Sequence, residues 1–133
     1  MKKVVVLGSG LVGSLMAKDL ASDGRFSVVA VDRSHEALSR LAGLPNLTTH
    51  RADLGSASEI TATIADADAV VGSVPGFLGT AMLRTVIAAK KPLADISFAP
   101  EDPLLLDAEA KANGVTAVVC FCRQAITVRR NAW

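Results

Sequence analysis

Short, mostly apolar segments alternate along the chain with segments in which apolar positions recur at helical spacing. The apolar segments predict six strands, over residues 2–7, 26–31, 47–52, 69–72, 93–97 and 115–119. The first is a β-branched run, as expected for a strand that is buried on both faces of a sheet. Strands that alternate with helices through short loops predict one α/β domain. Its sheet should be doubly wound and parallel, with about six strands and helices on both faces.

The apolar positions of two segments predict which faces of their helices are buried. Behind the first strand, the positions that recur at helical spacing are Val12, Leu15, Met16 and Leu20. In the segment 77–89 they are Phe77, Ala81, Met82 and Val86. We therefore expect these side chains to face the sheet.

Capping residues mark where several helices begin and end. Ser34 is expected to cap a second helix, and Ser56 begins a Ser-Ala-Ser-Glu capping box that ends on Glu59. Asp102 precedes a proline at the first helical position, and Gly114 follows the last turn of the same helix. These signals place the helices between the predicted strands.

The first strand runs directly into the sequence Gly-Ser-Gly-Leu-Val-Gly, with glycines at positions 8, 10 and 13. Between a strand and a helix, this G-x-G-x-x-G spacing is typical of the Rossmann fold, where it binds the pyrophosphate of a dinucleotide. Gly8 permits the tight turn, Gly10 lets the backbone approach the pyrophosphate, and Gly13 lets the helix pack close to the strand. The helix N-terminus attracts the phosphates. A plain turn between two packed elements is the alternative.

Asp32 ends the second strand, 19 residues after Gly13. A carboxylate at this place can accept hydrogen bonds from the adenosine ribose, and its charge disfavours the 2′-phosphate of NADP. We therefore predict that the cofactor is NAD rather than NADP. Arg33 favours NADP if it pairs with a 2′-phosphate, and it can also stack on adenine. An ordinary turn aspartate before a helix cap is the other interpretation of Asp32.

Further candidates follow the third, fourth and fifth strands, at the edge of the sheet where doubly wound folds bind ligands. Asp53 is within reach of the adenine or is simply a turn acid. The small residues of 72–76 can lie against the nicotinamide ribose or form a turn before the next helix, and Ser97 is expected to face the same crevice. The predicted cofactor-binding residues are Gly8, Ser9, Gly10, Leu11, Val12, Gly13, Asp32, Arg33, Asp53, Ser73, Val74 and Pro75.

Composition and charge exclude several other classes of protein. The chain has 133 residues, 20% of them charged, and a formal net charge of +1, which gives no electrostatic basis for binding nucleic acid or an anionic membrane. Its apolar stretches are too short, or too interrupted by glycine, for a membrane span or a signal peptide. Cys120 and Cys122 match neither a zinc site nor a disulfide framework. We therefore expect no bound metal and a reducing, cytoplasmic location.

Several segments together resemble the N-terminal domain of saccharopine dehydrogenase-like oxidoreductases, lysine 6-dehydrogenase-like members in particular. The similar segments are VVVLGSGLVG, VDRS, ADL and GSVPGFLGTAMLRTVIAAKKPLADISFAPEDPLLLDAEAKANGVTAVV. The most distinctive part is D-I-S-F-x-P-E-D at 95–102, because many folds share the glycines. The resemblance covers about residues 1–119.

The resemblance implies a Rossmann domain that binds NAD or NADP. Gly8, Gly10, Gly13 and Asp32 match the cofactor positions of the family, and Ser73–Pro75 match its loop beside the nicotinamide. Members of the family interconvert a C–N single bond and an imine by hydride transfer, with amino-acid substrates such as lysine or saccharopine. The resemblance assigns no catalytic residue to this chain.

The resemblance stops where the family continues with a Gly-Val-Ala-Pro-Gly stretch into a substrate and dimerisation domain. Here the sequence is CFCRQAITVRRNAW, which contains three arginines and no acidic residue. We therefore divide the chain into a dinucleotide-binding domain over 1–119 and an atypical basic tail over 120–133. A truncated or frame-shifted product is our interpretation of this change. The isolated chain is expected to be inactive, and a homodimer is left open.

Two other hypotheses belong to different functional classes. Regulatory nucleotide sensors that gate potassium transport are also single Rossmann units, with an acid after the second strand and another after the third. The segment at 95–102 speaks against that hypothesis. A partner-binding module that has lost its cofactor is the third hypothesis, and the intact glycines and Asp32 speak against it.

Overall fold

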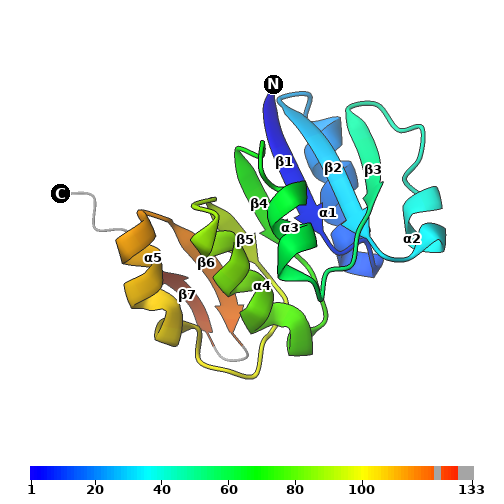
Figure 1. Ribbon diagram of the computed structural model, residues 1–133. Coiled ribbons are helices and arrows are strands. Elements are labelled where there is room, and N and C mark those ends of the chain that lie inside the picture. The colour runs from blue at the N-terminus through cyan, green and yellow to red at the C-terminus, as the bar shows by residue number, and fades with distance from the viewer. Residues whose placement is uncertain (122–123, 129–133) are drawn as a thin grey trace.

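Six parallel strands and one antiparallel strand form a single twisted sheet (Figure 1). The computed structural model describes residues 1–121 and 124–128. From one edge to the other the strands are β3 (Leu47–Arg51), β2 (Phe26–Asp32), β1 (Lys2–Leu7), β4 (Ala69–Gly72), β5 (Leu93–Asp95), β6 (Ala117–Phe121) and β7 (Gln124–Val128). The chain order reverses between β1 and β4, so a crevice is expected at the carboxyl ends of these two strands.

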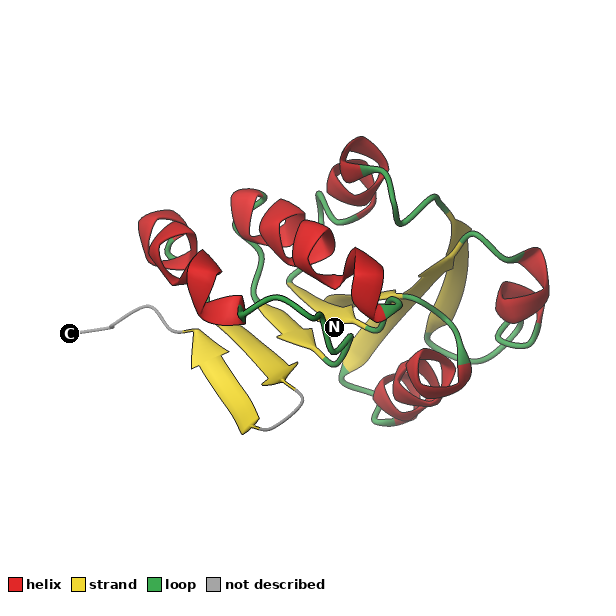
Figure 2. Cartoon of the chain, turned by 90° about the horizontal axis from the view of Figure 1, so that it is seen from below, coloured by secondary structure: helices red, strands yellow, loops and turns green. Residues whose placement is uncertain are grey.

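Helices cover both faces of the sheet (Figures 1 and 2). α1 (Leu11–Ser22) and α2 (His35–Ser39) lie on one face. α3 (Ala57–Thr63), α4 (Gly76–Ala88) and α5 (Asp107–Asn113) lie on the other, with the 3-10 turn η1 (Pro103–Leu106) leading into α5. The predicted doubly wound α/β fold is therefore confirmed. None of the helices in the described part of the chain has the length and apolar character to cross a bilayer.

The seventh strand lies in the segment predicted as a basic tail. β7 pairs antiparallel with β6, which begins and ends two residues later than the strand predicted over 115–119. Residues 126–128 are Ile, Thr and Val, which favour a strand. The proposed boundary falls inside β6, and the division into 1–119 and 120–133 stays a prediction.

The predicted helix caps are present. The hydroxyl of Ser34 accepts a hydrogen bond from the N–H of Ala37, and that of Ser56 accepts one from the N–H of Glu59. The Asp102 carboxylate caps η1, and Gly114 ends α5 in the left-handed conformation. The capping box is incomplete, however, because the carboxylate of Glu59 accepts from the N–H of a residue outside the box.

The prediction for the buried face of α1 is partly wrong. The buried residues are Gly13, Ala17 and Ala21. Of the predicted residues, Leu20 packs partly buried against the smaller core cluster, whereas Val12 and Leu15 are exposed. The reason is the close approach of the helix to the end of β1, where a Cβ on Gly13 would collide with the carbonyl of Gly8. Small residues at four-residue spacing therefore face the sheet, and Val12 and Leu15 are turned outward.

The prediction for α4 is half right. Met82 and Val86 are buried in the larger core cluster, as expected. Phe77 and Ala81 are exposed, because the buried stripe of the helix runs through Gly79 and Leu83 instead. Phe77 lies in the first turn of the helix, at the edge of the sheet where ligands bind in this fold.

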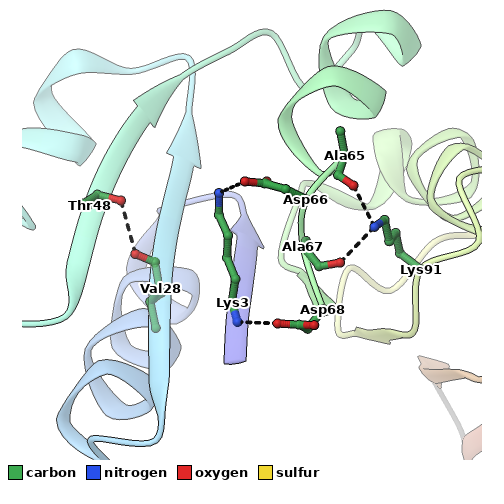
Figure 3. A network of polar contacts seen from close by, with 8 residues as sticks. All are labelled: Lys3, Val28, Thr48, Ala65, Asp66, Ala67, Asp68 and Lys91. Carbon is green, nitrogen blue, oxygen red and sulfur yellow. Dashed lines mark hydrogen bonds and ion pairs between the residues drawn. The ribbon is translucent and has the colours of Figure 1, made fainter. Parts of the chain in front are cut away.

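A polar network joins the loop between α3 and β4 to its neighbours near the amino ends of the strands (Figure 3). The Lys3 ammonium donates to Asp66 over 2.6 Å, and the backbone N–H of Lys3 donates to Asp68 over 2.8 Å. This ammonium holds the pKa of the exposed Asp66 below its usual range. Lys91 donates to the carbonyls of Ala65 and Ala67. The network stabilises the end of the sheet that is formed by the amino ends of the strands.

Candidate functional site

A groove of about 630 Å³ lies at the carboxyl ends of β1, β2, β4 and β5. This volume is within the range of small-molecule and cofactor sites. The groove also lies where the strand order reverses, which is the place where doubly wound sheets bind dinucleotides. The residues that line it are Gly8, Gly10, Leu11, Val12, Asp32, Arg33, Asp53, Leu54, Gly55, Ser73, Val74, Pro75, Gly76, Phe77, Leu78, Ile96, Ser97 and Phe98.

The glycine turn forms the middle of the groove. Gly8 has a φ of +100°, and a Cβ there would collide with the carbonyl of Ser73. Its N–H donates to the carbonyl of Val31 over 2.8 Å, which ties the turn to β2. Gly13 is buried in the first turn of α1 and packs against the backbone of Gly8. These two glycines therefore shape the turn.

Gly10 differs from the other two glycines because it faces open space. A Cβ at this position would meet no atom within 4 Å, and the residue lines the groove. It is also the N-cap of α1, and no side chain caps the helix there. The N–H groups of the first helical turn are therefore open to a ligand, and the helix dipole favours an anionic one.

Asp32 lies at the end of β2 and connects two loops through its carboxylate. One oxygen accepts from the N–H of Ser9 and the other from the N–H of Ser34, each over 2.8 Å. Ser9 itself is buried and donates its hydroxyl to the carbonyl of Val31. Asp32 therefore lines the groove and also holds the glycine turn against β2.

Two arginines flank the same end of the groove. Arg33 is exposed and lines the groove directly after Asp32. The guanidinium of Arg51, at the end of β3, donates to the backbone carbonyl of Arg33 over 3.0 Å. Positive charge therefore stands beside the carboxylate of Asp32 at the adenosine end that the sequence analysis assigned.

Asp53 lines the groove but also serves as a turn residue. Its carboxylate accepts from the N–H of Gly55 over 2.9 Å, and its own N–H donates to the carboxylate of Glu59 over 2.6 Å. Both interpretations of Asp53 are therefore compatible with its position: the side chain is exposed beside the groove and it also stabilises the loop after β3.

Two loops form the other end of the groove. Ser73, Val74 and Pro75 follow β4, and the N–H of Ser73 donates to the carbonyl of Leu7 at the end of β1 over 2.8 Å. Facing this loop is the turn 96–98 after β5. A Cβ on Gly76 would lie 2.9 Å from the carbonyl oxygen of Phe98, so the two loops are in close contact.

Several lining residues were not predicted from the sequence. Leu54, Gly55, Phe77, Leu78, Ile96 and Phe98 all border the groove. They share only their place at the carboxyl end of a strand or in the first turn of α4, and that place is the one signal that could have indicated them. Ten of the twelve predicted residues line the groove, while Ser9 and Gly13 support it from below.

The sheet topology, the glycine turn and the groove define a dinucleotide-binding domain of the Rossmann class. Comparison with protein families gives the more particular assignment. The family model of the saccharopine dehydrogenase NADP binding domain matches residues 4–118, and the chain belongs to this family. This membership favours an oxidoreductase domain over the regulatory nucleotide sensor and over the partner-binding module.

Individual relatives agree with this membership. The chain is 27% identical over 118 residues to saccharopine dehydrogenase [NADP(+), L-glutamate-forming] of Pyricularia oryzae, a match that covers 88% of the chain and 26% of that enzyme. The chain therefore spans about a quarter of the length of this relative.

Solved structures show the same fold. Apo saccharopine dehydrogenase (L-Glu forming) from Saccharomyces cerevisiae matches with a TM-score of 0.78 at 22% identity, over 90% of this chain and 27% of that one. WlbA dehydrogenase from Bordetella pertussis, solved with NADH and UDP-GlcNAcA, matches with a TM-score of 0.73 at 21% identity, over 90% of this chain and 37% of that one.

Proposed function

We propose that the groove binds NADP(H), with the pyrophosphate against the glycine turn and the N-terminus of α1. The observation that carries this proposal is Gly10, which has open space beside it at the uncapped start of the helix. The adenosine half would lie beside Asp32, Arg33 and Asp53, and the nicotinamide half beside Ser73–Pro75. The whole dinucleotide would thus run across the carboxyl ends of β2, β1 and β4.

The preference for NADP replaces the preference for NAD that Asp32 indicated in the sequence. The family that the chain belongs to is described as NADP binding. In the structure, both carboxylate oxygens of Asp32 accept backbone hydrogen bonds, which offset part of its charge. Arg33 is exposed on the same rim and is free to reach a 2′-phosphate. We therefore assign Arg33 to the 2′-phosphate.

Titration calorimetry with NADP and with NAD tests this choice. Wild type should bind NADP more tightly, and Arg33→Ala should weaken NADP by about tenfold while changing NAD little, because a charge-assisted hydrogen bond is lost. Arg25→Ala is the control, since Arg25 is also exposed but lies at the amino end of β2, away from the groove. A wild type that prefers NAD, or an Arg33→Ala variant that keeps its affinity for NADP, would overturn the assignment.

For the whole protein we propose hydride transfer at a C–N bond of an amino-acid substrate, as the family membership supports. Among the described lining residues, the titratable groups are Asp32, Arg33 and Asp53, all at the adenosine end. Phe77 and Phe98 stand exposed at the other end, where a substrate would meet the nicotinamide. The groups that hold the substrate and move its proton are therefore assigned to another part of the protein. Assays of the chain with and without that part would test this division.

A cytoplasmic location also belongs to this proposal. The chain has two cysteines, and Cys120 is a free thiol in the structure. Free thiols are typical of a reducing compartment. Microscopy of a fluorescent fusion would test the location, and accumulation outside the cytoplasm would contradict it.

A further inference from the structure

Arg51 ends β3 directly beside Asp32, which ends β2, and the two residues are partners in the register of the sheet. Arg51 is exposed, and its Nε donates to the backbone carbonyl of Arg33 over 3.0 Å. A guanidinium has five N–H donors, and within the described residues this is the one hydrogen bond that the Arg51 side chain makes. The other donors therefore remain for a ligand, on a side chain that is held against the loop after Asp32.

Arg33 and Arg51 differ from the other arginines that the structure describes. Arg25, Arg40 and Arg84 each form an ion pair with a carboxylate. In the described part of the chain, neither Arg33 nor Arg51 forms one. Both are exposed, and they meet at the end of the groove assigned to the adenosine. The planar fork of donors on an arginine matches two phosphate oxygens at once. The pair is therefore available to a phosphate group.

Acidic side chains crowd the same end of the groove. Asp32 and Asp53 line it, and the carboxylate of Glu59 lies behind Asp53, whose N–H donates to it over 2.6 Å. Among the described lining residues, Arg33 is the one cation. A phosphate monoester carries a charge of about −1.5 to −2 at neutral pH. Arg33 alone would leave a 2′-phosphate beside an excess of negative charge. A second cation is therefore needed, and Arg51 is the cation that contacts Arg33.

We propose that Arg51 is a second ligand of the 2′-phosphate of NADP, and that it also positions Arg33 by holding the backbone carbonyl of that residue. This inference rests on the proposed function of the groove. It explains how a site with an aspartate at the end of β2 accepts NADP, because an arginine from the neighbouring strand offsets the charge of Asp32. Selectivity for NADP then depends on β3 as well as on β2.

Two variants of Arg51 separate its charge from its fork of donors. Arg51→Met keeps the apolar part of the side chain and removes the guanidinium. Arg51→Lys keeps the positive charge but replaces the planar fork by a single ammonium. Arg25→Met is the control, because Arg25 is also exposed but lies at the amino end of β2, away from the groove.

The experiment measures the affinities for NADP and NAD by calorimetric titration, at low and at high ionic strength. Because a charge-assisted contact is lost, the ratio of the NADP affinity to the NAD affinity should fall about tenfold or more in Arg51→Met. The ratio should fall by a smaller factor in Arg51→Lys and stay constant in Arg25→Met. Salt should also weaken NADP binding less in Arg51→Met than in wild type. Partial unfolding leaves the ratio unchanged, because both cofactors titrate the same folded molecules.

A double variant tests whether Arg51 binds the phosphate itself. If Arg51 is a ligand, Arg51→Met should lower the ratio severalfold further in an Arg33→Ala background. If the double variant has the same ratio as Arg33→Ala alone, Arg51 acts only through Arg33, and the assignment of a second ligand is wrong.

The wild type distinguishes the two possible failures. If it prefers NADP and Arg51→Met keeps the wild-type ratio, even with both cofactors bound more weakly, the inference about Arg51 is wrong and the proposed function stands. If the wild type does not bind NADP, or prefers NAD, the proposed function is wrong and this inference is overturned with it.

Discussion

The carboxylate of Asp32 accepts a hydrogen bond from the backbone N–H of Ser9 over 2.8 Å. This bond joins the end of β2 to the glycine turn, across 23 residues of sequence. The acid that predicts the adenosine site in the sequence therefore also holds the turn of the proposed phosphate site. On the proposed function, cofactor selectivity and stability of the turn depend on the same side chain.

Asp32→Ala should affect both properties. Loss of the Asp32 carboxylate leaves the N–H groups of Ser9 and Ser34 without their acceptor, which should lower the free energy of unfolding by about 1–3 kcal/mol. The loss of negative charge should also raise the ratio of affinities for NADP and NAD. Urea unfolding and calorimetric titration measure the two effects. Asp32→Asn, which keeps one acceptor, should lose less stability, and equal losses in both variants would contradict this explanation.

Gly13→Ala should destabilise the domain where Gly10→Ala does not. A Cβ on Gly13 collides with the backbone carbonyl of Gly8, which cannot move without opening the turn. We expect a loss of about 1–3 kcal/mol for Gly13→Ala, typical of overpacking. Gly10→Ala has open space and a negative φ, and should stay within about 0.5 kcal/mol of wild type. Midpoints of urea unfolding compare them, and equal midpoints would show that α1 does not need its close approach.

The buried Asp95 should give the unfolding free energy a distinctive dependence on pH. Because burial raises the pKa of Asp95, its carboxyl group contributes stability below the ordinary aspartate pKa of about 4, and this contribution is lost as the pH rises through the raised value. Asp95→Asn does not titrate. The unfolding free energy of wild type minus that of the variant should therefore fall as the pH rises from about 4 through the raised pKa.

Asp66→Asn gives a control of opposite sign. The pKa of Asp66 is lowered by its hydrogen bond from Lys3, so its contribution is lost as the pH falls through the lowered value. The unfolding free energy of wild type minus that of Asp66→Asn should rise with pH below about pH 5. Chemical unfolding at several pH values measures both differences, and a rising difference for Asp95→Asn would show that the carboxylate is not penalised by burial.

The sequence was sufficient for the features that depend on local chemistry. The glycine turn, the acid after β2 and the loop after β4 follow from residue type, spacing and the strand–helix alternation, and they lie where those rules placed them. The caps at Ser34 and Ser56 were predicted for the same reason, because capping is decided within four residues.

The features that depend on packing were not predictable in the same way. The inward face of α1 is decided by the contact between Gly13 and the Gly8 carbonyl, so residue size and not apolar character determines what is buried. Leu78 lies in the first turn of α4 and Phe98 in the turn after β5, and they reach the groove only because these segments, distant in sequence from the glycine turn, pack beside it. The hydrogen bond between Ser97 and Asp95 likewise depends on packing, because both residues are buried at the end of β5.

The 133-residue chain should not turn over an amino-acid substrate by itself. Positioning a substrate and excluding water supply much of the rate of hydride transfer. The described lining residues at the proposed nicotinamide end, such as Pro75, Phe77 and Phe98, offer no acid or base. We expect no change in the absorbance of the reduced cofactor when the chain is incubated with NADP or NAD and either L-lysine or saccharopine. Turnover at rates ordinary for dehydrogenases would show that the catalytic groups are within the chain.

Calorimetric titration of Gly10→Val with NADP tests most directly whether the glycine turn is the pyrophosphate site. The Cβ of a valine would meet no atom within 4 Å, so the branched side chain would extend into the open space in front of the helix N-terminus. Ala88→Val is the control, because it also introduces a valine, at an exposed position at the end of α4. We predict that Gly10→Val keeps the unfolding midpoint of wild type and binds NADP at least about a hundredfold more weakly, a loss of about 2.7 kcal/mol, whereas Ala88→Val binds normally. A folded Gly10→Val variant that binds NADP as tightly as wild type would contradict the assignment of the groove.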